Sequence, residues 1–225
     1  TPMFTGLDLS SASSCALCIT LMQLSRPSAS FFQGAAPKKK MRLSNISKAY
    51  GGITVFDNFS SELPNGKITC ITGSSGCGKT TLLRIISGLE PFSGDISNRP
   101  EGKISAVFQE DRLFEELSAL ENCLLVTKDP TARIPAALIR TGLDKSDICR
   151  PVKELSGGMK RRAAIVRALC PDFGTLLLDE PFKGIDRDNA VKTAELIRET
   201  AAGKTIIIVS HEADCPLVSD ITISL

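Results

Sequence analysis

Side chains that many active sites use are scarce in this chain of 225 residues. It contains one histidine, one tyrosine and no tryptophan, so catalysis or binding through these side chains has few candidates. It also lacks a long apolar run. Residues 15–24 come nearest, but Thr and Gln interrupt this stretch, and it is far shorter than the ~20 apolar residues that span a bilayer. We therefore expect any membrane path for this protein to come from another chain.

A strong excess of one charge is absent as well. Lys and Arg number 27 against 25 for Asp and Glu, and this formal net charge of +2 gives no reason to expect nucleic acid as a partner. The eight cysteines lack the spacing of a disulfide scaffold, and we interpret them as reduced residues of a cytoplasmic protein. Cys15 and Cys18 form a CxxC pair, but no second CxxC pair or histidine pair completes a zinc site. We assign them no metal or redox role.

The first 40 residues differ from the rest of the chain. They are rich in Ser, Ala and Pro, show no sustained periodicity and end in Pro37 followed by three lysines. Such a composition is typical of segments that cannot bury a core. We expect residues 1–40 to be a disordered or non-native extension and residues 41–225 to form the folded domain.

Short apolar segments alternate with helical patterns within this domain. Strands that alternate with helices indicate an α/β fold with a mostly parallel sheet. Residues 110–153 have a mostly helical pattern, which Pro130, Pro135 and Pro151 interrupt. The remaining pattern predicts strands over 53–56, 67–72, 104–108, 175–178 and 205–209, and helices over 80–89, 158–170 and 188–201.

The clearest motif follows the predicted strand over 67–72. Residues 73–80 read GSSGCGKT, which fits GxxxxGK[ST] and leads directly into a predicted helix. The glycines let backbone N–H groups surround a phosphate, and the N-terminus of the helix favours its negative charge. In such a loop Lys79 reaches the β- and γ-phosphates, and the hydroxyl of Thr80 ligates Mg²⁺. The motif therefore predicts binding of a nucleoside triphosphate with Mg²⁺.

Two carboxylates follow the predicted strand over 175–178. Asp179 suits a Mg²⁺ ligand, commonly through water, and Glu180 is placed to orient or deprotonate an attacking water. Paired acids after a strand also occur in solvated turns or at helix starts, but the preceding phosphate-binding loop favours the catalytic interpretation. The phosphate-binding loop by itself leaves kinases, GTPases, helicases and transport ATPases open, and the paired carboxylates narrow this field.

A third motif narrows the class. Residues 155–159 read LSGGM and resemble the LSGGQ signature of ABC ATPases, about twenty residues before the paired carboxylates. Gln109 ends a predicted strand where this family has its Q-loop glutamine. Asp186 matches the D-loop aspartate, and His211, after the last apolar strand, matches the switch histidine. Tyr50 lies 23 residues before Gly73, where the family has the aromatic residue that stacks on adenine.

The resemblance covers about residues 41–225 and implies an ATP site with Mg²⁺. It implies that Lys79, Glu180 and His211 act in catalysis, with His211 hydrogen-bonding the γ-phosphate, and that Thr80, Gln109 and Asp179 hold Mg²⁺. The residues that it implies around the nucleotide are Tyr50, Val55, Gly73, Ser74, Ser75, Gly76, Cys77, Gly78, Lys79, Thr80, Thr81, Gln109, Ser156, Gly157, Gly158 and Asp186.

The resemblance also implies an architecture and partners. The fold would be a P-loop NTPase (RecA-like) core with an N-terminal antiparallel β subdomain and an inserted helical subdomain at about 110–155. A head-to-tail homodimer would place Ser156, Gly157 and Gly158 over the nucleotide of the other copy. The segments 107–113 and 117–122 look like importer subunits for nitrate, sulfonate or taurine-type anions. Such a subunit works in the cytoplasm, on the inner face of the cell membrane, beneath a separate permease.

Two positions depart from the family pattern, and two other functions stay open. Met159 replaces the signature glutamine, and residues 181–186 read PFKGID where a Ser-Ala-Leu-Asp-like run is usual.

A soluble ABC ATPase serving a cytoplasmic assembly, such as iron–sulfur cluster formation, would share every nucleotide motif. A small-molecule kinase or a GTPase is the other alternative, although the chain has no NKxD motif and a kinase has no use for the segment 155–158.

Overall fold

The computed structural model describes residues 39–127, 133–210 and 215–225. The extension expected at 1–40 lies outside this part of the chain apart from its last two positions, and Lys40 already begins the first strand. Cys15, Cys18 and His211 also lie outside it. No disulfide joins the six cysteines within the described residues. No helix among the described residues is long and apolar enough to cross a membrane.

A three-stranded antiparallel sheet begins the folded region. Its strands are β1 (Lys40–Tyr50), β2 (Ile53–Pro64) and β4 (Ser93–Ser97), in the order β2-β1-β4. Gly51 and Gly52 close the β1–β2 hairpin with φ values of 54° and 86°, a conformation in which glycine avoids the Cβ clash. Buried side chains on this sheet face a core that it shares with the first described helix.

A five-stranded parallel sheet forms the centre of the molecule. Its order is β5-β6-β7-β3-β8, with β3 (Ile68–Thr72), β5 (Ile104–Val107), β6 (Thr175–Asp179), β7 (Thr205–Val209) and β8 (Ile221–Ser224). Every paired strand runs parallel to its neighbour, so all five carboxyl ends lie at one edge of the sheet. All residues of β6 and β7 are buried, as expected for central strands covered on both faces.

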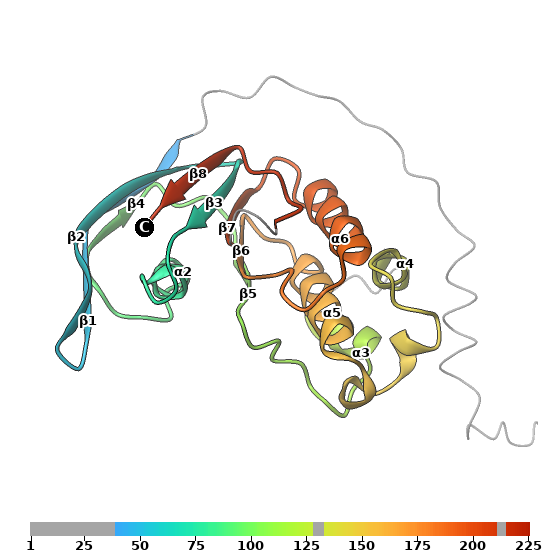
Figure 1. Cartoon of the computed structure of the whole chain (residues 1–225). Helices are drawn as coiled ribbons and strands as arrows, with labels where there is room; N and C mark the ends of the chain where they lie inside the picture. The colour runs from blue at the N-terminus through green and yellow to red at the C-terminus, as the bar shows by residue number, and fades with distance from the viewer. Residues whose placement is uncertain (1–38, 128–132, 211–214) are drawn as a thin grey trace, which may run out of the picture.

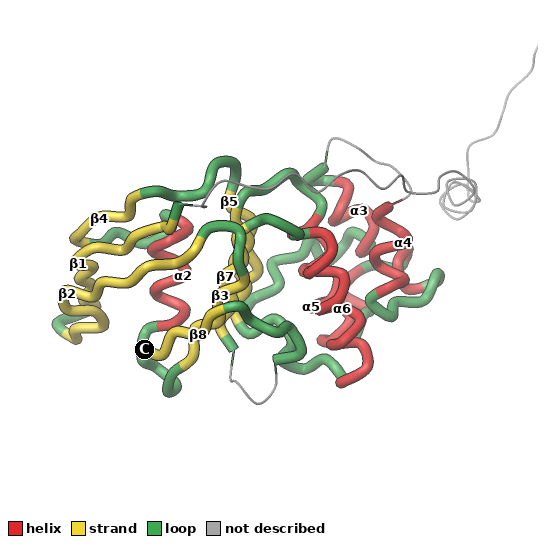
Figure 2. Tube along the Cα trace, turned by 90° about the horizontal axis from the view of Figure 1, so that it is seen from above, coloured by secondary structure: helices red, strands yellow, loops and turns green. Residues whose placement is uncertain are grey.

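Helices cover both faces of the parallel sheet, as Figures 1 and 2 show from two directions. Helix α2 (Lys79–Ser87) lies between the two sheets, where its buried residues pack against Leu177 and Ile207. Alternate residues of β6, Leu176 and Leu178, face the second core instead. The helices on that side are α3 (Ala119–Leu124), α4 (Arg133–Arg140), α5 (Gly157–Leu169) and α6 (Arg187–Thr200), with 3-10 helices at Asp147–Cys149 and Val152–Glu154.

The predicted elements are present, but several details were wrong. The strand expected over 53–56 continues to Pro64, where the Pro-Asn-Gly turn ends it. The segment 110–153 is less helical than expected, since loops and the two 3-10 helices separate α3 from α4 and α5 within the described residues. Pro135 does not break a helix because it lies in the first turn of α4, where a missing N–H costs no intrahelical bond. The strand predicted over 205–209 matches β7, and the remaining bounds differ from prediction by at most two residues.

Candidate nucleotide site

The loop over 73–80 leaves the carboxyl end of β3 and leads into α2. Gly73, Gly76 and Gly78 have φ values of 150°, 82° and 103°, which favour glycine. The buried Lys79 curls back into its own loop, and its Nζ donates to the carbonyls of Gly73 at 2.9 Å and Ser74 at 2.7 Å. The loop therefore forms a compact turn around the lysine ammonium.

The base of this loop rests on the antiparallel sheet. A Cβ at Gly78 would lie 2.7 Å from Cγ1 of Val55 and 2.9 Å from Cζ of Phe56. Strand β2 thus brings Val55, one of the residues that the family resemblance implies around the nucleotide, to this loop. Of the other predicted loop residues, Ser74, Ser75 and Gly76 are exposed, whereas Cys77, Thr80 and Thr81 are half-buried. A bound molecule could therefore reach the outer part of the loop.

Asp179 ends the buried strand β6 and is fully buried. Neither of its carboxylate oxygens has a hydrogen-bond partner among the described residues, and an unpaired buried polar group is costly. Burial raises the pKa of the Asp179 carboxyl above its ordinary value, and the nearby hydroxyl of Thr80 acts in the opposite direction. A hydroxyl and an orphaned carboxylate are oxygen donors of the kind that Mg²⁺ prefers. These residues fit the ion that the sequence predicts.

Glu180 has an unusual backbone conformation and an ion pair. Its φ of 47° lies in the left-handed region, which is uncommon for a residue with a Cβ. Its amide donates to the carbonyl of Val209 at 2.9 Å, which ties it to the end of β7. Its carboxylate is 16% exposed and lies 3.0 Å from the ammonium of Lys183. Strained backbone of this kind clusters at functional sites.

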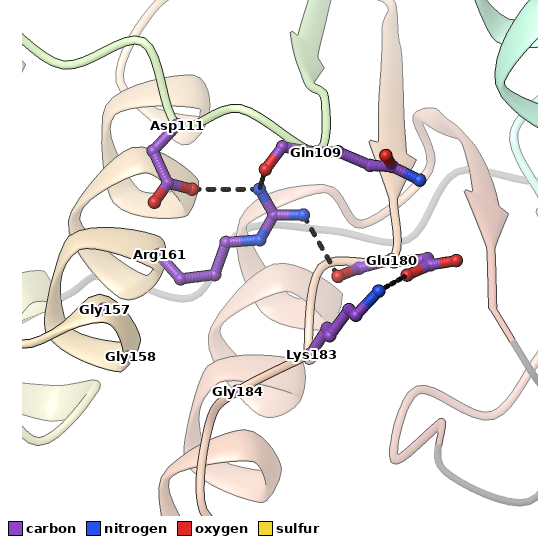
Figure 3. Close-up of a pocket in the computed structure, with 8 residues that line it drawn as sticks. All are labelled: Gln109, Asp111, Gly157, Gly158, Arg161, Glu180, Lys183 and Gly184. Carbon is purple, nitrogen blue, oxygen red and sulfur yellow. Dashed lines mark hydrogen bonds and ion pairs between the residues drawn. The ribbon is translucent and has the colours of Figure 1, made fainter.

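A cavity of about 330 Å³ joins three predicted motifs at this edge. Gln109 from the loop after β5, Gly157 and Gly158 from the start of α5, and Glu180 line it together (Figure 3). In this view the side-chain ends of Gln109 and Glu180 extend to the same side. Gly158 packs closely on the D-loop, because a Cβ there would lie 2.8 Å from the carbonyl oxygen of Gly184.

Ser156 and Asp186 act locally as helix N-caps. The Ser156 hydroxyl accepts from the amide of Met159 at 3.3 Å and caps α5. The Asp186 carboxylate accepts from the amide of Asn189 at 3.0 Å and caps α6, and these bonds lower the pKa of Asp186. Met159 takes part in the cap of α5 through its backbone amide, and its partly buried side chain packs against the core.

Tyr50 lies at the end of the antiparallel sheet. Tyr50 ends β1 with an exposed ring, and the ammonium of Lys48 lies 4.6 Å from the ring centroid. Lys48 in turn forms an ion pair with Glu90 at 2.9 Å. The structure gives no contact between Tyr50 and the loop over 73–80. His211 lies outside the described residues, two positions after the end of β7 in the sequence, and β7 ends at the same sheet edge as β3 and β6.

Arg161 is a residue of this site that the sequence analysis missed. The sequence pattern placed it in the helix predicted over 158–170 and gave it no role, yet it is 5% exposed and its guanidinium lies among the motif residues. Figure 3 shows it between Asp111, Gln109 and Glu180. No sequence signal separates it from its basic neighbour Arg162, which is equally buried but contacts Asp186 instead, since only the fold decides which loops each guanidinium meets.

The parallel sheet, the loop over 73–80 and the acidic end of β6 define a P-loop NTPase. Comparison with known proteins gives the family: residues 56–183 match the family described as "ABC transporter". An aliphatic sulfonates import ATP-binding protein, SsuB 1 of Pseudomonas syringae pv. syringae (strain B728a), is 37% identical over 183 residues, covering 79% of this chain and 76% of the relative. A lantibiotic transport ATP-binding protein, SrtF of Streptococcus pyogenes, is 34% identical over 183 residues, covering 76% and 80%.

Solved structures similar to this chain belong to the same family. The dimeric structure of MJ0796, a bacterial ABC transporter cassette, aligns with a TM-score of 0.73 at 27% identity, covering 82% of this chain and 94% of that chain. The same cassette in a post-hydrolysis state bound to ADP and Pi aligns with a TM-score of 0.72 at 26% identity over the same shares. The chain belongs to the ABC transporter family. It is an ATPase that binds ATP with Mg²⁺.

Proposed function

We propose that this chain is the ATP-hydrolysing subunit of an ABC importer and works as a homodimer beneath a separate membrane permease, on its cytoplasmic face. The observation that carries the proposal is that the phosphate-binding loop, Gln109, Asp179 and Glu180 meet at one edge of the parallel sheet. The names of the relatives support transport, and the dimeric cassette supports pairing. Those names include different cargoes, so the cargo is not carried over.

Within this proposal the predicted residues have defined tasks. The loop over 73–80 and Thr81 hold the phosphates. When ATP binds, the ammonium of Lys79 turns from the carbonyls of Gly73 and Ser74 toward the β- and γ-phosphates. Thr80, Gln109 and Asp179 hold Mg²⁺, which when bound neutralises phosphate charge. Glu180 orients the attacking water. His211 contacts the γ-phosphate from the end of β7, and Tyr50 and Val55 hold the adenine.

A second copy would complete the site. Gly157 faces open space, because a Cβ there would meet no atom within 4 Å. The N-terminus of α5 therefore presents an accessible positive helix end, which favours an anion. We propose that Ser156, Gly157 and Gly158 of one copy cover the nucleotide held by the other, with Asp186 at the contact between copies.

The proposed docking surface for the permease lies on residues 110–155, which we propose as the helical subdomain of a domain spanning 41–225. Phe114, Leu124, Leu125 and Val126 are exposed there, with Phe114 62% and Leu125 58% exposed. The buried Asn122 holds Phe114 beside α3: its Oδ1 accepts from the amide of Phe114 at 2.8 Å, and its Nδ2 donates to the carbonyl at 3.0 Å. Such an apolar surface suits a partner protein.

Co-purification from detergent-solubilised host membranes tests this function. The tagged full chain should retain a polytopic membrane protein in stoichiometric amount, identified by mass spectrometry. The Phe114→Glu/Leu125→Glu variant should lose that partner and keep Mg-ATP binding. Val218→Glu, which charges an exposed apolar residue in the segment before β8, is the matched control and should retain the partner. Recovery of soluble partners alone would reject the transporter and favour the ATPase of a cytoplasmic assembly.

A further inference from the structure

Arg161 joins two loops that come from different parts of the sequence. Its Nη1 donates to the carbonyl of Phe108, to the carbonyl of Gln109 at 3.3 Å and to Oδ1 of Asp111 at 2.9 Å. Its Nη2 donates to the carbonyl of Asp179 at 2.6 Å and to that of Glu180 at 3.0 Å. One nitrogen therefore holds the loop after β5, and the other holds the end of β6 (Figure 3).

The guanidinium is suited to this geometry, and its burial makes it costly to disturb. A planar guanidinium offers donors in a fixed fork, whereas a lysine ammonium is a single point charge and cannot reach both loops in the same way. Arg161 is nearly inaccessible to solvent, and Asp111 is its acidic partner. A buried charge with one carboxylate and four carbonyl acceptors is well satisfied, so the side chain has little freedom to move.

The contact with Glu180 has a particular consequence. Glu180 adopts a left-handed backbone conformation that persists only where its surroundings enforce it. Its amide donates to the carbonyl of Val209 at 2.9 Å, and its carbonyl accepts from the amide of Lys183 at 3.2 Å and from Nη2 of Arg161 at 3.0 Å. The direction of the Glu180 carboxylate follows from this backbone conformation. Of these contacts, only the one with Arg161 connects Glu180 to the loop after β5, and loss of Arg161 removes that connection.

We propose that Arg161 is a positioning residue for ATP hydrolysis, which fixes the carboxylate of Glu180 relative to the side chain of Gln109. The inference rests on the proposed function, because it takes Glu180 to orient the attacking water. Arg161 does not touch the nucleotide in this account. Arg161 makes the orientation of the Glu180 carboxylate depend on the position of the loop after β5. Displacement of this loop by a bound partner would therefore change the orientation of that carboxylate.

Arg167 provides a matched comparison on the same helix. It also donates to two backbone carbonyls of the loop after β5, those of Arg112 at 2.6 Å and Asp111 at 2.9 Å. Among the described residues, its guanidinium donates no hydrogen bond to Asp179 or Glu180. Loss of Arg167 therefore loosens the same loop from α5, but it leaves the restraint on Glu180 in place.

Steady-state ATP turnover and Mg-ATP binding of the full chain test the proposal in Arg161→Gln, Arg161→Lys and Arg167→Gln. We expect both Arg161 variants to lower kcat on the order of 10- to 100-fold, the loss that small misplacement of a reacting group produces. The KM for ATP and the Kd for a fluorescent ATP analogue should stay within about twofold, since the loop over 73–80 is untouched. Arg167→Gln should keep kcat within about twofold of the unsubstituted chain.

Two results would overturn the proposal. One is an equal effect of Arg161→Gln and Arg167→Gln on kcat per folded molecule. The other, which decides the matter if Arg161→Gln fails to fold, is full kcat in Arg161→Lys, because charge alone would then suffice. Glu180→Gln, measured in parallel, separates the proposed role of Glu180 from that of Arg161. Turnover retained in Glu180→Gln rejects the proposed role of Glu180, whereas an inactive Glu180→Gln beside an unaffected Arg161→Lys rejects only this inference.

Discussion

The ammonium of Lys183 lies 3.0 Å from the carboxylate of Glu180, three residues earlier in the same turn. Lys183 belongs to the segment that departs from the usual D-loop pattern, so this departure places a cation on the proposed hydrolytic group. Lys183 is 77% exposed, and Glu180 is mostly buried. The pair therefore restrains the carboxylate from the solvent side, where its effect depends on salt.

Removal of this ion pair should speed turnover modestly. An exposed pair contributes up to about 1 kcal/mol, so Lys183→Met should raise kcat about two- to fivefold at low salt, because the carboxylate no longer has to leave the ammonium. The gain should disappear as salt screens the pair. Steady-state ATPase assays between low and high salt measure it, with Lys192→Met on the exposed face of α6 as control. A lower kcat in Lys183→Met would contradict this account.

The two signature glycines should respond differently to alanine. Gly157 has open space at its Cβ position, whereas a Cβ at Gly158 would lie 2.8 Å from the carbonyl oxygen of Gly184. Gly158→Ala should cost about 1–3 kcal/mol of folding stability through overpacking. Gly157→Ala should leave Tm unchanged and still lower ATP turnover, because its Cβ would project toward the nucleotide of the second copy. Thermal unfolding and ATPase assays check both, and full turnover in Gly157→Ala would contradict the shared site.

Gly78 should tolerate alanine less well than a glycine of similar conformation elsewhere. Both Gly78 and Gly51 have positive φ, so alanine is strained at either position by about 1–2 kcal/mol. Only Gly78 would add contacts with Val55 and Phe56 shorter than 3.0 Å. Gly78→Ala should therefore lose about 1–3 kcal/mol more than Gly51→Ala and should also lose Mg-ATP binding. Chemical denaturation measures the difference, and equal losses would show that the contact with β2 is unimportant.

The capping box of α3 should make part of the stability depend on pH. The carboxylate of Glu121 accepts from the amide of Ser118 at 2.8 Å and from its hydroxyl at 2.7 Å, and these bonds hold the pKa of Glu121 below its ordinary value. A lowered pKa contributes stability that is present above the unfolded pKa, about 4.3, and is lost as pH falls through the folded value. Because this carboxylate is largely exposed, the contribution should be about 0.5–1 kcal/mol.

Glu121→Gln keeps the capping geometry and removes the charge, so it isolates this contribution. The variant should unfold more easily than the unsubstituted chain at pH 7 and match it well below pH 4, where both side chains are neutral. Denaturation midpoints measured across this range check the sign. A difference that persists at the acid end would show that the carboxylate charge is not its source.

The sequence predicted the motifs of the candidate site, but not the strand order or the tertiary contacts that hold these motifs in place. The backbone conformation of residues 73–80 can be predicted from the local sequence, because it depends on the glycines and on the helix that follows. The same holds for the acids after the apolar strand β6. Strand order depends on tertiary pairing, and β4 in particular has the sequence SGDIS, which offers no alternation and becomes a strand only by pairing with β1.

Arg161 and Lys183 illustrate what local patterns leave open. On a basic helix, the inward direction of one guanidinium is decided by the loops that pack against it, and those loops come from positions 108–111 and 179–180. The lysine in the D-loop was recognised as unusual, but its partner depends on the left-handed turn at Glu180. Both features require the backbone path of the folded chain.

The most direct test of the account is ATP turnover by Glu180→Gln, measured together with ATP-dependent pairing of the chain by light scattering. If Glu180 orients the attacking water and two copies enclose the nucleotide, the variant should bind Mg-ATP normally, form a dimer when ATP is added and lose at least about 100-fold in turnover. Turnover near that of the unsubstituted chain, or a monomer at saturating Mg-ATP, would contradict it.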